Sequence, residues 1–225
     1  MNTEDLKKVS AQEALKLISC GNIVGLGGGR SIAYLIEMLS EKPDLKVRIV
    51  TPSIKTKLLC IKHGLEVLPT YSIDRVDVAF DGCDQVDRAL NALKSGGAIH
   101  TREKLIASMA KDYILLVDKD KVVEKLEFKH PVAIEVLLEA LGYVERVLKE
   151  IGSNPIVRVS SNKDGFLISD DGNIIIDAFF EKVEDIAQLD KKLNSIFGVI
   201  GTSLFVQKVT KVIVASEEGI EIIKR

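Results

Sequence analysis

The stretch NIVGLGGGRSIAYLIEML, residues 22–39, decides the fold class of this chain. Residues 22–26 are mostly apolar and predict a buried strand, which Gly27-Gly28-Gly29 ends. Four apolar residues then recur at the spacing of one helix face, namely Ile32, Leu35, Ile36 and Leu39. A strand, a glycine turn and an amphipathic helix in this order are typical of one unit of a parallel α/β sheet.

The same alternation continues through the first half of the chain. Further strands are predicted at 47–50, 76–80 and 114–117, and further helices at 56–63 and 101–111. The first helix is predicted to begin at Ser10, because Ser10-Ala11-Gln12-Glu13 has the form of a capping box. Its buried face is expected to hold Ala14, Leu17 and Ile18. Strands separated by helices of this length predict a Rossmann-like parallel sheet with helices on both faces.

The pattern changes after residue 117. The second half predicts short strands at 133–136, 156–160, 165–169, 173–177, 203–206 and 211–215, and helices at 137–151 and 183–196. Asp171-Gly172 supplies a turn with positive φ that joins 165–169 to 173–177 as a hairpin. This order predicts a smaller antiparallel α+β domain of the ferredoxin-like kind. One of the last two strands could complete this domain while the other returns to the large sheet.

These patterns predict two domains. We expect a Rossmann-like catalytic domain made of residues 1–128 and 207–225, and a small α+β domain of residues 129–206 inserted into it. A chain of 225 residues is long enough to give each domain its own core.

The composition limits the class of ligand. The formal net charge is −2 and the pI is about 6.0, whereas a nucleic-acid-binding protein usually has a basic surplus. Aromatic residues make up 5% of the chain and none is Trp, so aromatic stacking is not expected to be the main means of recognition. We therefore expect a small ligand that is held by hydrogen bonds and charge.

The sequence also contains no pattern that is typical of a membrane span or of a structural metal site. No apolar run reaches the roughly 18 residues that a membrane helix needs, so no membrane partner is expected. The polar start has no signal-peptide core, and Cys20, Cys60 and Cys83 form no CxxC pair and no zinc-ligand pattern. These features predict a cytoplasmic protein without a structural metal.

The first candidate functional segment is Gly25-Leu26-Gly27-Gly28-Gly29-Arg30-Ser31, between a predicted strand and a predicted helix. Backbone N–H groups at a helix start can bind an anion, and Arg30 and Ser31 would add a guanidinium and a hydroxyl. Arg30 stands where a dinucleotide fingerprint needs Gly or Ala, and the lysine of a Walker loop is absent. A tight turn without a ligand is the alternative.

The second candidate segment is Asp81-Gly82-Cys83-Asp84, directly after the strand predicted at 76–80. Ligands bind at the carboxyl ends of parallel strands, so both carboxylates are expected to face the cleft. A close acidic pair can bind sugar hydroxyls, hold Mg²⁺ or share protons. Cap and turn roles, which are common for Asp after strands, are the alternative.

The third candidate segment runs from the turn Lys94-Ser95-Gly96-Gly97 to Glu103. This second glycine-rich turn could cradle an anion, and Glu103 in the first turn of the next helix could act as a general base. For Glu103 the alternative is a favourable interaction with the helix dipole.

Taken in order, these segments resemble ribose-5-phosphate isomerase of the A type along nearly the whole chain. Asp81 to Asp87 is similar to the family's Asp-Gly-Ala-Asp-Glu-Val/Ile-Asp run, and Leu93 to Ala98 resembles its Lys-Gly-Gly-Gly turn. Arg102-Glu103-Lys104 matches its Arg-Glu-Lys, and Lys121 fits its Ser-Lys position with Asp120 before the lysine. Later matches are Pro131 to Val136, Asp171 to Asp177, Gly198-Val199 and Leu204-Phe205.

The resemblance implies an aldose–ketose isomerase that interconverts ribose 5-phosphate and ribulose 5-phosphate in the non-oxidative pentose phosphate pathway. Glu103 would be the base that moves a proton between C1 and C2 through an enediolate, with no metal and no other cofactor. Asp81, Asp84 and Lys94 would hold and polarise the sugar oxygens and help to open the ring. The resemblance also implies a homodimer or homotetramer. Other substrate-binding residues would be Gly28, Gly29, Arg30, Ser31, Gly82, Cys83, Ser95, Gly96, Gly97, Lys121 and Lys7.

The first loop departs from the family pattern. The family reads Gly-x-Gly-Thr-Gly-Ser-Thr, whereas here Gly28, Arg30 and Ser31 replace the three hydroxyl residues, so two hydroxyls are lost and a guanidinium is gained. Ser95 replaces a glycine in the second turn. Two other functions stay open at this point: a non-catalytic sensor module that binds a sugar phosphate, and a related sugar-phosphate or acyl-transfer enzyme.

Overall fold

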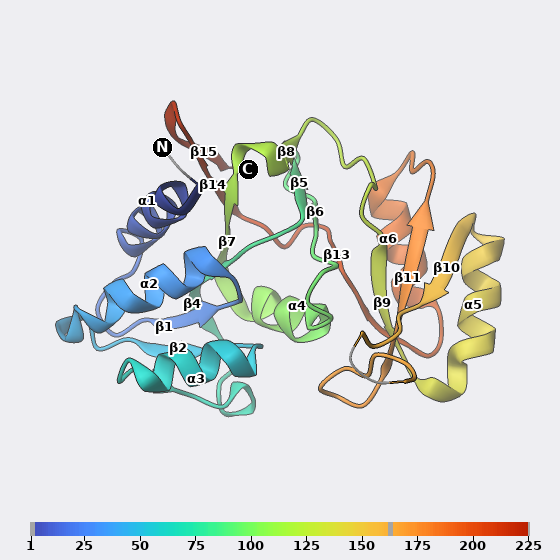
Figure 1. Cartoon of the computed structure of the whole chain (residues 1–225), viewed down its shortest axis with the longest axis horizontal. Coiled ribbons are helices and arrows are strands. Elements are labelled where there is room, and N and C mark those ends of the chain that lie inside the picture. The colour runs from blue at the N-terminus through green and yellow to red at the C-terminus, as the bar shows by residue number, and fades with distance from the viewer. Residues whose placement is uncertain (1–2, 162–163, 225) are drawn as a thin grey trace.

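A mixed sheet of seven strands forms the larger part of the molecule (Figure 1), in the order β15-β14-β7-β4-β1-β2-β3. The computed structural model describes residues 3–161 and 164–224; residues 1, 2, 162, 163 and 225, which fall within the predicted domains, lie outside them. Neighbouring strands pair in parallel except β15, which is antiparallel to β14. The strands are β1 (Ile23–Leu26), β2 (Arg48–Val50), β3 (Glu66–Val67), β4 (Val76–Asp81), β7 (Ala110–Asp118), β14 (Lys211–Ser216) and β15 (Gly219–Lys224).

Helices cover both faces of this sheet, as the alternation of buried side chains along β4 requires. Val78 and Phe80 share an apolar cluster with α1 (Thr3–Leu15), α2 (Arg30–Ser40) and α3 (Ile54–Lys62). Ala79 points to the other face, where it joins Ile106 and Ala107 of α4 (His100–Met109). The predicted Rossmann-like arrangement is confirmed.

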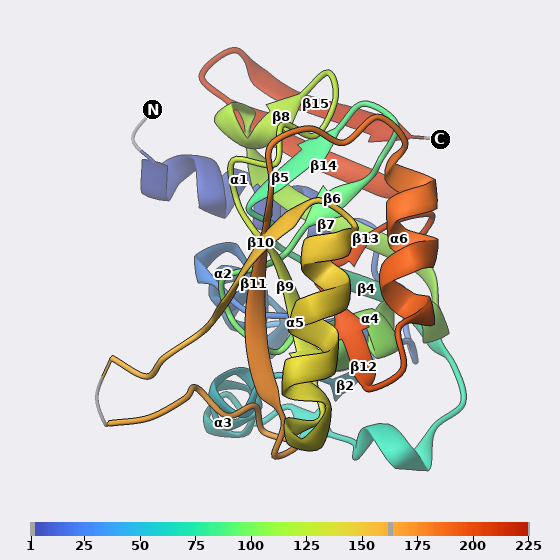
Figure 2. The same cartoon turned by 90° about the vertical axis from the view of Figure 1, so that its right-hand side faces the viewer.

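A second sheet is antiparallel, in the order β10-β11-β9-β12, and both of its helices pack on one face (Figure 2). Its elements follow the β-α-β-β-α-β order of a ferredoxin-like unit, so this prediction is confirmed as well. They are β9 (Val132–Val136), α5 (Leu141–Glu150), β10 (Ser153–Val157), β11 (Ile174–Phe180), α6 (Ile186–Ser195) and β12 (Val199–Thr202). We call residues 132–202 the small unit.

A third sheet, which the sequence did not predict, lies between the other two (Figure 1), in the order β13-β6-β5-β8. Its strands are β5 (Gln85–Asp87), β6 (Ala92–Leu93), β8 (Val122–Val123) and β13 (Leu204–Phe205). Each has two or three residues, too few for an alternating pattern to stand out. The predicted strand 203–206 therefore belongs to this sheet, and β12 completes the small unit instead. β14 returns to the large sheet as expected.

Several predicted boundaries are wrong. α1 begins at Thr3, and the supposed cap residue Ser10 lies buried inside it, with its hydroxyl donating to the carbonyl of Lys7. The Ser10 side chain thus forms a hydrogen bond to the backbone of the preceding helical turn instead of capping the start of the helix. Leu17 follows the end of α1 and is exposed, whereas Ala14 and Ile18 are buried as expected.

The predicted hairpin around Asp171-Gly172 is only half formed. Gly172 has a φ of 83°, and its N–H donates to the carbonyl of Ser169, so the turn is present. Residues 165–169, however, make only isolated bridges, such as Ile168 with Ile174, and not a strand. The remaining short elements are the 3-10 helices η1 (Pro43–Leu45), η2 (Thr70–Ser72), η3 (Lys119–Lys121) and η4 (Leu138–Ala140).

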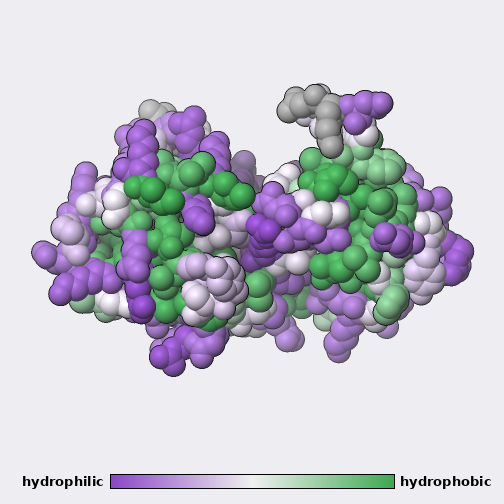
Figure 3. All heavy atoms as spheres, turned by 90° about the horizontal axis from the view of Figure 1, so that it is seen from below, coloured by the Kyte–Doolittle hydropathy of each residue, from purple (hydrophilic) through white to green (hydrophobic). Residues whose placement is uncertain are grey.

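Figure 3 shows the molecule from below. Hydrophobic side chains lie on the part that contains the large sheet and on the small unit, and hydrophilic side chains lie between these two parts. None of the helices described is both long and apolar enough to cross a lipid bilayer. The domain boundaries at 128/129 and 206/207 and the homodimer or homotetramer stay predictions.

Gly25 lets α4 approach the large sheet. A Cβ built there would lie 2.6 Å from Cβ of Ala79 and 2.8 Å from Cγ2 of Ile106, both in the core. We predict that Gly25→Ala lowers the free energy of unfolding by about 1–3 kcal/mol, because the core must shift to admit the methyl group. Urea denaturation of both proteins measures this change in the free energy of unfolding.

Gly142→Ala is the matched control. Gly142 lies in α5 with no atom near the added Cβ, so the same substitution should stabilise by about 0.5–1 kcal/mol. Equal effects of the two substitutions would contradict the close approach of α4 to the sheet.

Candidate active site

Three buried charged side chains meet at the carboxyl end of β4. Asp81 ends β4, Lys94 follows β6, and Glu103 lies in the first turn of α4. Nζ of Lys94 lies 3.0 Å from Oδ2 of Asp81 and 3.4 Å from Oε1 of Glu103. We call these residues the charged cluster. The structure thus brings together three of the four residues predicted to be catalytic.

Asp81 is held by several donors. Its Oδ1 accepts the N–H of Gly82 at 2.8 Å and that of Gly28 at 3.4 Å, and its Oδ2 accepts the hydroxyl of Tyr113 at 2.9 Å. The carboxylate also occupies the space where residue 27 would carry a Cβ, only 2.0 Å from Oδ1. Gly27 is therefore required if Asp81 is to lie against the first loop.

Burial and charge set the protonation states of the charged cluster. Burial, together with the negative charge of Asp81, raises the pKa of Glu103 to about 8, and Lys94 opposes part of this rise. Burial alone would lower the pKa of Lys94, but the charges of Asp81 and Glu103 outweigh it and raise that pKa. At neutral pH Lys94 is therefore a cation, and Glu103 titrates in the range where a base can both accept and release a proton.

The fourth predicted residue, Asp84, lies against the second glycine turn. Its Oδ2 accepts the N–H groups of Ser95 and Gly96, the first at 2.5 Å and the second at 3.3 Å. The Ser95 hydroxyl donates to the carbonyl of Pro131 and lies 3.1 Å from Oγ of Ser203. Asp84 therefore shapes the turn that carries Lys94 instead of joining the charged cluster directly.

The first loop carries a separate group of charges. Gly29 has a φ of 102°, which favours glycine, and leaves α2 without a side-chain cap. Arg30 is largely exposed and pairs with Glu4 of α1 at 3.3 Å, and Lys7 pairs with the same carboxylate at 3.2 Å. Glu4 thus brings Lys7 to Arg30, which stands between Gly29 and Ser31 at the start of α2.

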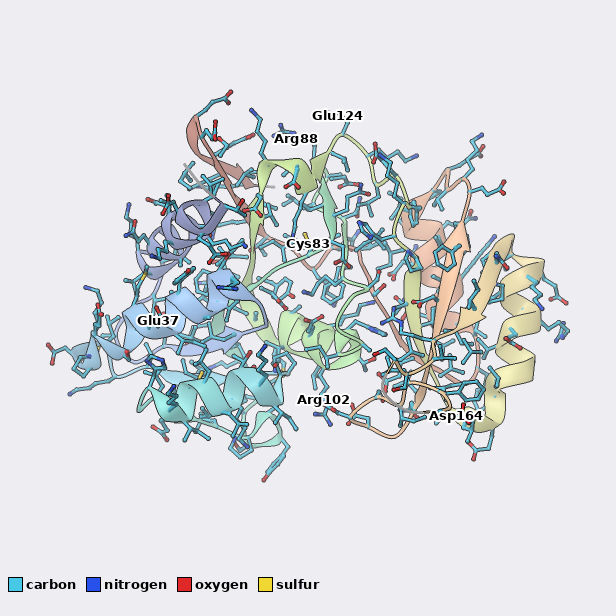
Figure 4. The ribbon with its side chains drawn as sticks, in the orientation of Figure 1. Glu37, Cys83, Arg88, Arg102, Glu124 and Asp164 are labelled. Carbon is cyan, nitrogen blue, oxygen red and sulfur yellow. The ribbon has the colours of Figure 1, made fainter. Side chains whose placement is uncertain are left out.

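Lys121 and Cys83 meet at the turn after β4, where Figure 4 labels Cys83. Nζ of Lys121 donates to the carbonyl of Cys83 at 2.9 Å, so Lys121 reaches the Asp81–Asp84 segment. Burial raises the pKa of the Cys83 thiol to about 12, which leaves it protonated and unsuited to act as a nucleophile.

Sequence reasoning missed three residues of the site. Tyr113 is buried in β7 and stacks on Phe205, Thr56 donates to the carbonyl of Gly27 at 2.8 Å, and Arg158 of the small unit reaches the second glycine turn. None of them stands next to a recognisable motif, so only the pairing of strands and units could reveal them. The polar residue Tyr113 within the apolar run of β7 was the one available signal.

The Arg-Glu-Lys segment makes contacts on both sides of Glu103. Arg102 extends from α4 toward the β10–β11 loop (Figure 4) and forms a bidentate pair with Asp171, at 2.9 and 2.6 Å. Lys104 donates to Oγ1 of Thr202 and to the carbonyl of Leu204. Both neighbours of Glu103 therefore tie α4 to the later half of the chain.

A buried ammonium beside two carboxyl groups suits proton transfer at carbon. Such a cation can stabilise an oxyanion while a carboxylate removes a proton from the adjacent carbon. Within residues 3–161 and 164–224, no group of three His, Cys, Asp or Glu side chains is arranged to hold a metal ion. Within the charged cluster, the Lys94 ammonium is the positive charge that could stabilise such an oxyanion.

Comparisons with known proteins point to one family. A family model described as ribose 5-phosphate isomerase A (phosphoriboisomerase A) matches residues 48–219. The ribose-5-phosphate isomerase A of Pyrococcus horikoshii is 39% identical over 100% of both chains, and that of Methanocaldococcus jannaschii is 37% identical over 100% of both.

Solved structures give the same result. A D-ribose-5-phosphate isomerase in complex with phospho-erythronic acid superposes with a TM-score of 0.94 at 39% identity, over 100% of both chains. The ribose 5-phosphate isomerase A of M. jannaschii superposes with a TM-score of 0.92 at 35% identity, again over 100% of both.

Removing the Tyr113 hydroxyl tests whether its hydrogen bond stabilises the buried Asp81 carboxylate. We predict that Tyr113→Phe lowers the free energy of unfolding by about 1.5–3 kcal/mol at neutral pH, because a buried carboxylate loses a donor while the ring still stacks on Phe205. Urea denaturation measures this loss. Tyr71→Phe, at an exposed tyrosine, is the control and should change nothing. Similar losses in the two variants would argue against the hydrogen bond.

Proposed function

The chain belongs to the ribose 5-phosphate isomerase A family, and from this premise we propose that it interconverts ribose 5-phosphate and ribulose 5-phosphate with Glu103 as the base. The observation that carries the proposal is the buried Lys94 ammonium between the carboxyl groups of Asp81 and Glu103. Glu103 supplies a proton acceptor and Lys94 a fixed positive charge, which are the two groups that an enediolate mechanism needs.

The proposed reaction moves one proton between adjacent carbons. In the open-chain aldose, the ionised Glu103 removes the proton from C2, and the electrons of that bond form a C1–C2 double bond as O1 becomes an oxyanion. Lys94 stabilises this charge. The proton on O2 passes to O1, and Glu103 returns its own proton to C1, which yields the ketose. Atoms and electrons balance without an oxidant or a cofactor.

The two aspartates have different proposed roles. Asp81 keeps Lys94 charged and oriented, because its carboxylate is already surrounded by Gly28, Gly82 and Tyr113. Asp84 holds the second glycine turn through Oδ2, and its Oδ1 receives no hydrogen bond from any residue that the structure describes. We infer that Oδ1 of Asp84 binds a sugar hydroxyl and helps to open the ring.

We further propose that the phosphate binds at the start of α2. The backbone N–H groups of Gly29, Arg30 and Ser31 would supply donors there, with Lys7 and Arg30 as counter-charges. Glu4 would have to release these two cations when the phosphate arrives. Arg30 would replace the hydroxyl groups that the family pattern has in this loop.

The relatives support an enzyme over a sensor. The proteins that match over the full length are named as isomerases, and one of them was solved with phospho-erythronic acid. A phosphorylated aldonic acid has a planar, negatively charged carboxylate, as an enediolate has a planar, negatively charged centre. The buried Lys94 ammonium against the Glu103 carboxyl group also supports a catalytic role for this cluster.

Replacing the proposed base tests the function. We predict that the wild-type protein converts ribose 5-phosphate to ribulose 5-phosphate in the presence of a chelator, and that Glu103→Gln lowers kcat at least about 10³-fold. The amide keeps the shape of the side chain but cannot accept the proton from carbon.

Glu13→Gln, at a partly exposed residue of α1 that pairs with Lys16, is the control and should retain full activity. Near-normal turnover by Glu103→Gln would remove Glu103 from the role of base. Binding of ribose 5-phosphate by the wild type without conversion would favour the sensor.

The raised pKa of Glu103 predicts a pH dependence. Only the ionised carboxylate accepts a proton, so kcat/KM should fall as the pH drops through about 8, and should level off above it. Initial rates between roughly pH 6 and 9 measure this limb, because kcat/KM reports ionisations of the free enzyme. A flat profile across that range would contradict the elevated pKa.

A further inference from the structure

Arg158 joins the small unit to the second glycine turn. It follows β10, and its guanidinium is largely buried. On one edge it forms a bidentate pair with Asp177 of β11, with Nε 2.8 Å from Oδ2 and Nη2 bonded to Oδ1. Asp177 therefore fixes the plane of the guanidinium.

The other edge of Arg158 meets the backbone next to Lys94. Nη2 donates to the carbonyl of Ser95 at 2.9 Å, and Nη1 donates to that of Gly96 at 3.4 Å. These are the two residues that follow Lys94 in the chain. One side chain of the small unit thus binds both carbonyls of the turn.

The turn is held from both sides. Asp84, after β4, binds the N–H groups of Ser95 and Gly96, while Arg158 binds the carbonyls of the same two residues. The N–H of Lys94 also donates to the carbonyl of Ser203 at 3.0 Å. The backbone from Lys94 to Gly96 therefore has its polar groups fixed by two different parts of the fold.

We propose that Arg158 is a positioning residue of the isomerase, which holds the turn of Ser95 and Gly96 so that the Lys94 ammonium stays against Glu103 and Asp81. This inference rests on the proposed function for its catalytic consequence. Arginine is required because one planar group must serve a carboxylate and two carbonyls at once, which an ammonium cannot do. The small unit thereby acts on the reaction through a backbone contact.

Loss of Arg158 has a defined physical consequence. The carbonyls of Ser95 and Gly96 and the largely buried Asp177 carboxylate lose their donor, and no side chain of the small unit then binds the carbonyls of the turn. The backbone next to Lys94 is then less restrained, so the Lys94 ammonium is held less firmly against Glu103. The groups that face Glu103 in the cluster are Asp81, Lys94 and Tyr113, so a displaced Lys94 leaves the repulsion from Asp81 less opposed.

The test compares Arg158→Met and Arg158→Lys with Arg146→Met. Arg146 pairs with Glu150 on the exposed surface of α5 in the same unit, so it controls for the loss of an ion pair there. We expect Arg158→Met to lower kcat/KM about 10–100-fold, mainly through kcat, because Lys94 acts on the transition state. Arg158→Lys should recover little of this loss, and Arg146→Met should match the wild type.

Two further measurements separate positioning from loss of folding. The acid limb of the kcat/KM profile should move to higher pH in Arg158→Met, by up to about one unit, since Glu103 loses part of its stabilising cation. Hydrogen exchange of peptides that cover residues 93–99 should be faster in Arg158→Met and unchanged in Arg146→Met. An unfolded variant would instead exchange fast throughout.

Failure of the positioning role and failure of the proposed function would give different results. Unchanged exchange in the turn, or faster exchange with unchanged kcat/KM and pH profile in an active enzyme, would overturn the positioning role. An inactive wild type would refute the proposed function alone. In that case the exchange measurement still decides whether Arg158 holds the turn.

Discussion

The burial of one lysine between two carboxyl groups is the constraint on which the rest of this structure depends. An ammonium removed from water is tolerated only when opposite charges and hydrogen bonds surround it. Lys94 obtains them from Asp81 and Glu103, and Asp81 in turn obtains donors from Gly28, Gly82 and Tyr113. The cluster therefore needs β4, β7, α4 and both glycine turns in place at once.

Each of the three sheets contributes to the placement of the charged cluster. The large sheet presents Asp81 at the end of a central strand and, through Gly25, lets α4 approach closely enough for Glu103 to reach the same point. The short strands of the third sheet set the turn that carries Lys94. Ser203, which follows β12, and Arg158 of the small unit both contact that turn. The charged cluster at the end of a parallel sheet is thus supported by a unit that shares no strand with that sheet.

The first loop differs from the family pattern in its side chains, while its backbone leaves the start of α2 uncapped. A positive φ at Gly29 and an uncapped α2 leave N–H groups available whichever side chains follow. In this chain a guanidinium and a lysine gather around Glu4 beside that loop. The proposed phosphate site would therefore rely more on charge and less on hydroxyl donors than the family pattern does.

The sequence by itself determined the fold class and predicted most of the candidate site, because both depend on local patterns. Alternating strands and helices predict the Rossmann-like sheet, and Asp81, Lys94 and Glu103 stand at strand ends and at a helix start. The third sheet and the place of residues 203–206 were decided by pairing between distant segments, which outweighs weak local signals over two or three residues. The charged cluster, its support by Tyr113 and the contact of Arg158 with Ser95 exist only in the tertiary structure. Burial and distance set the charge of Glu103, and neither can be read along the chain.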